Sequence, residues 1–92
     1  MATGKITQII GAVIDAAREL GLLENTRIIY TSDHGEALGA HGLFGKANLL
    51  EPGAGVPLLM CGPGVPVGHV ETAPVSHVDL FPTILDGAGL AA

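Results

Sequence analysis

A helix-period stretch followed closely by a strand-like run constrains this chain more than any other feature. Between residues 5 and 20, apolar residues recur at the spacing of one helix face, and Gly21 is a natural helix end. Asn25 and Thr26 then turn the chain into residues 27–31, which are mostly apolar and rich in β-formers. A helix joined to a strand by a short link is typical of one layer of an α/β sheet.

Side chains with metal-binding and anion-binding chemistry follow directly after this strand. Asp33, His34, His41 and Lys46 lie within 14 residues, separated by glycines. Carboxylate oxygen and imidazole nitrogen side by side suit a divalent metal such as manganese, zinc or, less well, calcium. Because neighbouring side chains of a strand point to opposite faces, Asp33 and His34 can share one ion only where the strand has ended. Gly35 gives the chain freedom for that turn.

The residues alone leave other interpretations open. Asp33 is equally well explained as a turn carboxylate, and Lys46 as a solvated surface lysine. In favour of a site, ligands of open α/β sheets gather just outside the carboxyl ends of strands, where Asp33 and His34 fall. A lysine nearby suits an anionic substrate held beside a metal. Glu36 is interpreted as a turn-stabilising group rather than a ligand, and His41 as a residue that either orients the loop or lines the pocket.

Several segments carry a resemblance to a known family. The stretch TSDHGEALGAHGLFGK resembles the second metal-binding segment of the sulfatase family, within the alkaline phosphatase superfamily. AARELGLLENTRIIYTSDHGE, GVPLLMCGPG and VSHVDLFPTILDGAGL are similar to successive segments of that family, in the same order. The branch that this chain most resembles includes choline-sulfatase-like enzymes and phosphonate monoester hydrolases. The resemblance implies a fragment of an alkaline-phosphatase-like α/β/α sandwich with a mostly parallel sheet.

The same resemblance implies roles for individual residues. It makes Asp33 and His34 ligands of a divalent metal (calcium, manganese or zinc), and Lys46 a catalytic residue that contacts the sulfate or phosphate oxygens. His41 lies in the matching Gly-x-His-Gly and is predicted to belong to the catalytic site. The nucleophile of sulfatases is a formylglycine made from Cys or Ser in a Cys/Ser-x-Pro-x-Arg signature. Cys61 is followed by Gly-Pro but by no arginine, so it is interpreted as a small buried apolar residue and not as the nucleophile.

The implied function is metal-dependent hydrolysis of a small anionic sulfate ester. One alternative is a phosphonate monoester or phosphodiester hydrolase of the same superfamily. Another is a non-catalytic domain remnant that binds a partner through its sheet edge. Asp33 and His34 alone under-coordinate a metal, because stable sites need four or more ligands. The remaining carboxylates and the formylglycine are expected in an N-terminal half of the domain, which is then a partner of this chain. The 92 residues alone are expected to be inactive.

Composition excludes several other classes. A chain of 92 residues forms at most one domain, and 48% of its residues are hydrophobic but only three are aromatic. This is typical of a slab of a larger α/β layer rather than a self-sufficient small domain. The net charge of −5 gives no basic surface for nucleic acid, and the single cysteine excludes an internal disulfide. No apolar run predicts a membrane span, and residues 1–20 do not read as a secretory signal; a cytoplasmic and a periplasmic parent are both compatible.

The whole chain is therefore interpreted as part of one sulfatase catalytic domain. Residues 52–55 are expected to form a flexible turn, and residues 70–72 a short edge strand. Ser76 and Asp79 are expected to cap the last helix as a pair. The expected elements are a helix at about 5–20, a strand at about 27–31, a metal and substrate loop at 32–48, a strand at about 56–61 and a helix at about 79–86.

Overall fold

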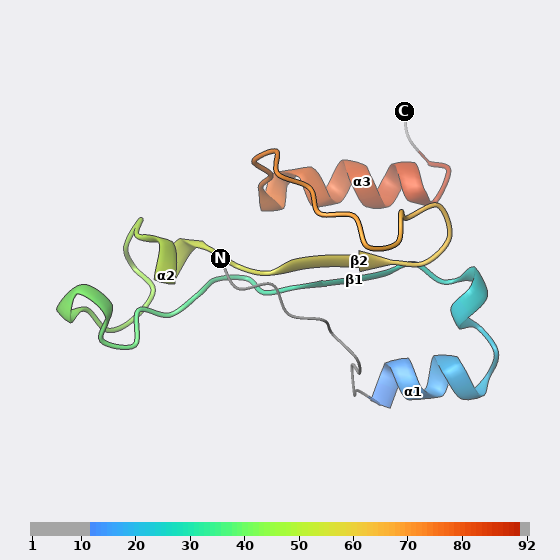
Figure 1. Cartoon of the computed structure of the whole chain (residues 1–92), viewed down its shortest axis with the longest axis horizontal. Coiled ribbons are helices and arrows are strands. Elements are labelled where there is room, and N and C mark those ends of the chain that lie inside the picture. Colours follow the sequence, from blue (N-terminus) through green and yellow to red (C-terminus); the bar gives the residue numbers. More distant parts are fainter. Residues whose placement is uncertain (1–11, 91–92) are drawn as a thin grey trace.

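A computed structural model describes residues 12–90 of the chain (Figure 1). Between its main elements lie short 3-10 turns at Leu23–Asn25, Ala40–Gly42 and His77–Asp79. The main elements are α1 (Ala12–Glu19), β1 (Ile28–Thr31), α2 (Glu51–Ala54), β2 (Leu58–Cys61) and α3 (Leu80–Gly87).

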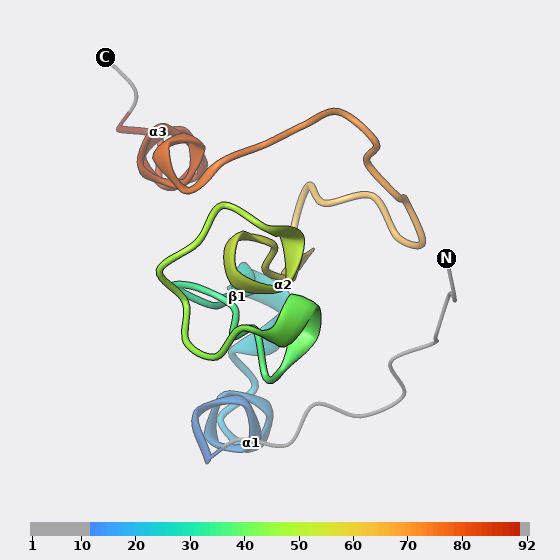
Figure 2. The ribbon, with the colours of Figure 1, turned by 90° about the vertical axis from the view of Figure 1, so that its left-hand side faces the viewer.

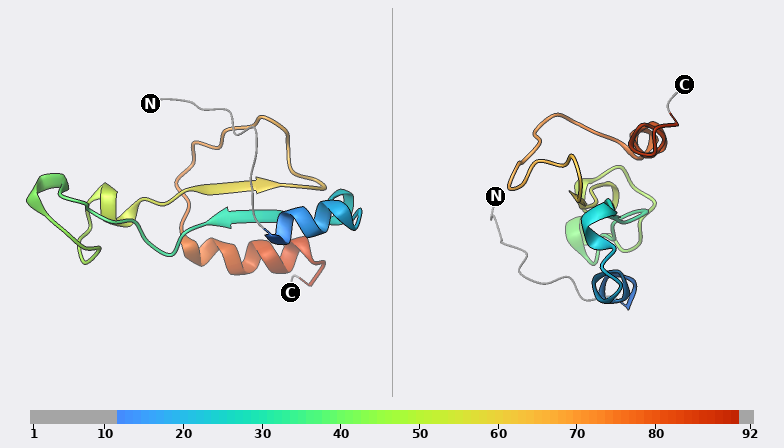
Figure 3. Two further views of the ribbon diagram at one scale, coloured as in Figure 1. Left: turned by 90° about the horizontal axis from the view of Figure 1, so that it is seen from below. Right: turned by 90° about the vertical axis from the view of Figure 1, so that its right-hand side faces the viewer.

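The described elements form layers. The two strands lie side by side, and α1 and α3 lie on opposite sides of them (Figures 1 and 2). The segment from the end of β1 to the start of β2, which contains α2, extends beyond one end of the strands (Figure 3). This protruding segment contains all four of the predicted site residues.

The sheet consists of one antiparallel pair. Ile28 lies opposite Cys61 and Thr31 lies opposite Leu58. The chain leaves the end of β1, folds through the protruding segment and returns beside the same strand, which makes the pair antiparallel. The predicted mostly parallel sheet is therefore not what these two strands form. β2 begins at Leu58 rather than at residue 56, because Pro57 has no N–H to donate to the ladder.

Arg27 joins three segments at the end of the sheet that lies away from the protruding segment. Its Nε donates a hydrogen bond to the carbonyl oxygen of Pro63, with 2.6 Å between the two atoms. Its guanidinium lies close to Gly64 and Gly87, where an added Cβ would lie 2.8 Å and 2.7 Å from its terminal nitrogens. The start of β1, the turn after β2 and the end of α3 therefore meet at one side chain.

The two longer helices lie close to their predicted positions. α1 covers Ala12–Glu19, while residues 5–11 of the predicted helix lie outside the described residues. The N–H of Ser76 donates to Asp79 Oδ2 at 2.7 Å, so this pair caps the 3-10 turn His77–Asp79, and α3 continues from that turn at Leu80. The expected capping pair is thus present. Pro82 fits near the start of α3 because the N–H groups of a first turn have no partner in the helix.

Three local predictions were wrong. Residues 51–54 form the short helix α2 instead of a flexible turn; Pro52 lies at its N-terminus, where its fixed φ favours a helix start. Residues 70–72 form no strand, because the Glu71 carboxylate accepts the N–H groups of Thr72 and Ala73, each at 2.8 Å. Cys61 is exposed instead of buried.

Very little apolar surface is buried within the described residues. Among residues 14–90, Ala37, which is 5% exposed, is the one buried apolar side chain. Ile84 of α3 is 55% exposed, although it lines a cavity of about 480 Å³ between α3 and the sheet. Within residues 12–90, no helix has the length and apolar character needed to cross a bilayer. The helices and strands thus leave large apolar side chains exposed, which further polypeptide could cover.

Candidate metal and anion site

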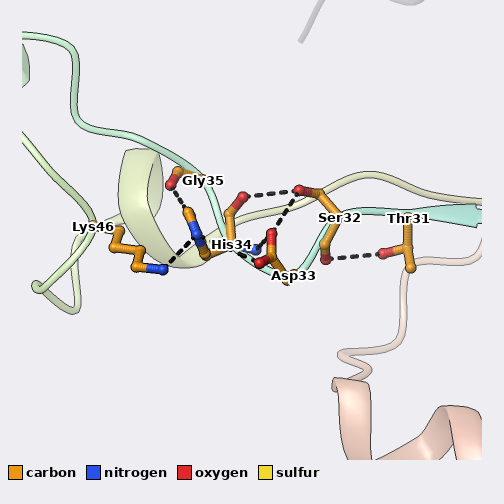
Figure 4. Close-up of polar contacts among 6 residues, drawn as sticks. All are labelled: Thr31, Ser32, Asp33, His34, Gly35 and Lys46. Atoms are coloured by element: carbon orange, nitrogen blue, oxygen red, sulfur yellow. Dashed lines mark hydrogen bonds and ion pairs between the residues drawn. The ribbon is translucent and has the colours of Figure 1, made fainter.

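β1 ends in a tight polar turn that brings Asp33 and His34 to the same side of the chain (Figure 4). The hydroxyl of Ser32 donates to the carbonyl oxygen of His34 at 2.9 Å. The N–H of His34 donates to Asp33 Oδ1, also at 2.9 Å. These bonds replace strand pairing, so the two consecutive side chains no longer point to opposite faces. Asp33 Oδ2 lies 3.5 Å from His34 Nε2.

The imidazole of His34 is oriented by the backbone. Nδ1 lies 2.7 Å from the carbonyl oxygen of Gly35. Because a carbonyl oxygen only accepts, Nδ1 carries a hydrogen. In the neutral ring, Nε2 then carries the one lone pair, which can either accept a hydrogen bond or ligate a metal. Asp33 Oδ2 and the Lys46 amine both lie near the imidazole (Figure 4).

Lys46 reaches this region from the far end of the loop. Its Nζ lies 2.7 Å from His34 Nε2, across a sequence separation of 12 residues. Since an ammonium group has hydrogens and no lone pair, it donates and the imidazole accepts. A carboxylate, an imidazole and an amine, from three of the four candidate site residues, are thus brought together.

Asp33 is exposed, and the groups around it favour its ionised form further. The N–H of His34, bonded to Oδ1, lowers the pKa of the Asp33 carboxyl below its ordinary value. The positive charge of the Lys46 ammonium lowers the pKa further. The group is therefore a carboxylate at neutral pH, the form that binds a cation.

Residues 36–46 form a loop that is closed at its base and at its tip. At the base, the N–H of Ala37 donates to the carbonyl oxygen of Gly45 at 3.1 Å, and the Glu36 carboxylate accepts the N–H of Gly45. At the tip, the N–H of Gly39 donates to the carbonyl oxygen of Leu43 at 2.8 Å. Glu36 stabilises a turn, as expected from the sequence.

His41 lies at the tip of this loop, apart from the other predicted site residues. Its backbone has a positive φ of 54°, and the residue is exposed. Among the described residues, no hydrogen bond or ion pair joins it to Asp33, His34 or Lys46. Leu38 has a φ of 48°, so the loop holds two non-glycine residues in a left-handed conformation that costs energy. The predicted catalytic role of His41 stays a prediction.

Gly35 holds the site against α2. Its N–H donates to the carbonyl oxygen of Gly53 at 2.9 Å. A Cβ at this position would come closer than 3.0 Å to the carbonyl oxygen of Pro52 and lie 3.1 Å from that of Gly55. The carbonyl group that orients His34 therefore belongs to the residue most tightly enclosed by the neighbouring helix, which fixes where the imidazole lies.

The donor set fits part of a divalent metal site. Two ligands on one ion, each about 2.0–2.4 Å from it, lie about 3.0–3.5 Å apart, and the 3.5 Å between Asp33 Oδ2 and His34 Nε2 agrees with this. The spacing alone is not distinctive, since His69 Nε2 and Glu71 Oε2 are also 3.5 Å apart on the surface. What distinguishes the first pair is the backbone-held ring and the adjacent lysine. In residues 12–90 no three His, Cys, Asp or Glu side chains are grouped to hold a metal.

Fold and site define an α/β protein with a carboxylate, an imidazole and an amine at the end of a strand. The model of the sulfatase family matches residues 4–90, so the chain belongs to the sulfatase family. It is similar to arylsulfatase K of Canis lupus familiaris (49% identity over 80 residues; 87% of this chain, 15% of the relative) and of Homo sapiens (47% over 81; 88% and 15%). It is also similar to choline-sulfatase of Rhizobium meliloti (strain 1021), with 40% identity over 82 residues, 89% of this chain and 16% of the relative.

This chain thus spans about 15% of the length of the curated relatives that it matches. No solved structure matches it at a significant level. Membership of the family brings with it an α/β fold.

Two features that shape the site were not foreseen from the sequence. One is the Ser32 hydroxyl, for which the signal is a serine at the last position before the Asp-His pair, where hydroxyls often bond to nearby backbone. The other is the close approach of Gly35 to α2, whose only sequence signal is the glycine itself.

Proposed function

We propose that this chain supplies part of the catalytic domain of a metal-dependent sulfuric ester hydrolase. The observation that carries the proposal is the meeting of Asp33, His34 and Lys46 at the end of β1. Family membership supports it, and so do the relatives, which are named arylsulfatase K and choline-sulfatase. A cation held by the first two residues and an ammonium beside it suit a substrate whose reacting group is an anion.

In this proposal each of the three residues has one task. Asp33 and His34 hold a divalent metal, for which calcium, manganese and zinc all remain candidates. When bound, that metal would act as a Lewis acid on an ester oxygen. When His34 Nε2 ligates the metal, the Lys46 ammonium has to leave that nitrogen; it then binds the sulfate oxygens and offsets negative charge that builds up there as the ester bond breaks. We include His41 in the proposed catalytic site because it lies in the same loop, whose tip has to move toward Lys46 before His41 can contact the substrate.

Two ligands do not complete a metal site, so the proposal includes polypeptide beyond these 92 residues. Further carboxylates and the nucleophile, a formylglycine in the sulfatase family, are expected there. The same polypeptide would supply the strands that extend the antiparallel pair into a larger, mostly parallel sheet. The exposed apolar faces of α3 and β2 support this, because covering them is the main way such layers gain stability. The chain alone is expected to show no turnover.

Sulfate esters are favoured over phosphate or phosphonate esters by the names of the relatives. The geometry suits both, since Lys46 is a single point charge and not a bidentate fork. A binding comparison separates them. Phenyl sulfate, phenyl phosphate and phenol are added to the isotope-labelled chain in the presence of calcium, and the resonances of His34 and Lys46 are followed by NMR. Phenyl sulfate is expected to shift them most and phenol not at all; a preference for phenyl phosphate would favour the phosphoryl-transfer alternative.

Lys46→Met tests the anion contact, with Arg18→Met as its matched control. Both substitutions remove one positive charge, but Arg18 lies on α1, where it pairs with Asp15 at 3.5 Å. Loss of an exposed charge-assisted contact of about 1 kcal/mol weakens binding about fivefold, so Lys46→Met is expected to raise the dissociation constant by about that factor. Equal weakening in both variants would show that only net charge matters. Hydrolysis of an aryl sulfate by the purified chain would contradict the proposed incompleteness.

A further inference from the structure

Gly45, the residue just before Lys46, is held on both of its backbone sides. Its carbonyl oxygen accepts the N–H of Ala37 at 3.1 Å. Its N–H donates to Glu36 Oε1, which also accepts the N–H of Leu38 at 3.4 Å. One carboxylate therefore connects the two ends of a loop across nine residues of sequence.

This closure fixes where the Lys46 side chain starts. With Gly45 held, the backbone of Lys46 has a set position at the base of the loop, and only the side-chain torsions are left to place the amine. That amine lies 2.7 Å from His34 Nε2. A lysine on an open loop would spread its amine over a large volume, because its four-carbon stem is among the most flexible of all side chains.

Glu36 itself takes no direct part in the cluster. Within the described residues its carboxylate bonds to two backbone N–H groups and to no side chain. A carboxylate in that role acts as an acceptor, so a neutral group with an oxygen at the same place can replace it. This differs from the demand on Asp33, whose negative charge is needed to hold a cation.

We propose that Glu36 is a positioning residue, which places the Lys46 amine beside His34 by holding the N–H of Gly45. The inference rests on the proposed function only for what Lys46 then binds. The positioning itself is a property of the loop and is measurable without any substrate.

Substitutions that keep, move or remove the acceptor oxygen test the proposal. Glu36→Gln keeps it, Glu36→Asp moves it back by one methylene, and Glu36→Ala removes it; Glu24→Ala, an exposed acid in the 3-10 turn before β1, is the control for charge. The first readout is the exchange rate of the Gly45 amide proton. The second is the nuclear Overhauser effect between the Lys46 side chain and the His34 ring. The third is the affinity for phenyl sulfate.

Glu36→Ala is expected to speed amide proton exchange at Gly45 at least tenfold, to abolish the nuclear Overhauser effect between Lys46 and His34 and to weaken phenyl sulfate binding. Glu36→Gln is expected to keep the effect and to bind within about threefold of the wild type, and Glu24→Ala to change nothing. If Glu36→Ala disrupts the pairing of β1 with β2, Glu36→Asp decides instead: it is expected to lose the effect while the strand amides stay in place.

Persistence of the Lys46–His34 effect in Glu36→Ala, or in Glu36→Asp if that variant has to decide, would overturn the proposal. So would a Glu36→Gln variant that loses the effect as fully as Glu36→Ala, since charge and not the acceptor would then matter. Failure of the wild-type chain to bind phenyl sulfate would count against the proposed function alone, because the exchange and contact measurements still decide whether Glu36 positions Lys46.

Discussion

Gly35→Ala is the substitution for which the structure predicts the largest local damage. The new Cβ would overlap the carbonyl oxygen of Pro52, which has to move by about 1 Å to reach a normal contact distance. That movement breaks the hydrogen bond from the N–H of Gly35 to the carbonyl oxygen of Gly53. Overpacking and the lost bond together are expected to cost about 2–4 kcal/mol. The position does not require a left-handed backbone, so the cost is one of space.

Gly42→Ala is the matched control, because it adds the same methyl group where nothing lies within 4 Å of the new Cβ. Its φ of 71° makes an alanine unfavourable by about 1–2 kcal/mol. Urea denaturation followed by circular dichroism measures both. With a slope of about 1 kcal/mol per molar urea, Gly35→Ala should lower the midpoint by about 2–4 M, or unfold the chain without urea, and Gly42→Ala by less. Equal midpoints for the two variants would refute the close packing of Gly35 on α2.

Two further predictions concern the rest of the chain. Arg27→Met keeps the apolar stem but loses the hydrogen bond to the Pro63 carbonyl oxygen. It is expected to lower the free energy of unfolding by about 1–2 kcal/mol in the same denaturation assay, and the control Arg18→Met by less than about 0.5 kcal/mol. Equal costs would argue against the contact of Arg27 with three segments. The N–H groups of Ala73 and Thr72, with His69, lower the pKa of Glu71 from its ordinary 4.5. The hydrogen bonds that the Glu71 carboxylate accepts are therefore fully formed above pH 4.5 and are lost as pH falls through the lowered pKa. The amide shifts of Thr72 and Ala73 should titrate with a midpoint below 4.5 and stop doing so in Glu71→Gln; a midpoint above 4.5 would contradict this.

The sequence was most informative where a periodic pattern or a cap determines structure locally. α3 was predictable because Ser76 and Asp79 specify its start, and β1 because β-formers run up to Thr31. The second strand was predicted to start at residue 56 but starts at Leu58, so the prediction was two residues too long. The reason is Pro57, which has no N–H to donate to the ladder.

Predictions failed where side chains compete with backbone ladders or where burial depends on distant parts. Glu71 takes the amides that an edge strand would need, and this competition is not visible as a pattern. Cys61 was expected to be buried from its residue type, but burial depends on how fully β2 is covered, and the described elements leave Cys61 exposed.

The site shows the same division. That Asp33 and His34 come together follows from a strand ending just before them. The reach of Lys46 across 12 residues depends on the loop closure at Gly45 by Glu36, a contact that sequence spacing does not indicate. Family resemblance pointed to Lys46, whereas the structure supplies the physical reason for its position.

Asp33 and His34 are proposed to share one divalent ion, and paramagnetic broadening by Mn²⁺ tests this most directly. Mn²⁺ is added to the wild-type chain, to Asp33→Asn and to His34→Gln, and the resonances of residues 33 and 34 are followed at each concentration. If the two side chains hold one ion, each substitution should raise the Mn²⁺ concentration needed to broaden the other residue, by about tenfold. Unchanged broadening at Asp33 in His34→Gln would show that the carboxylate binds the ion alone, and would contradict a shared metal site.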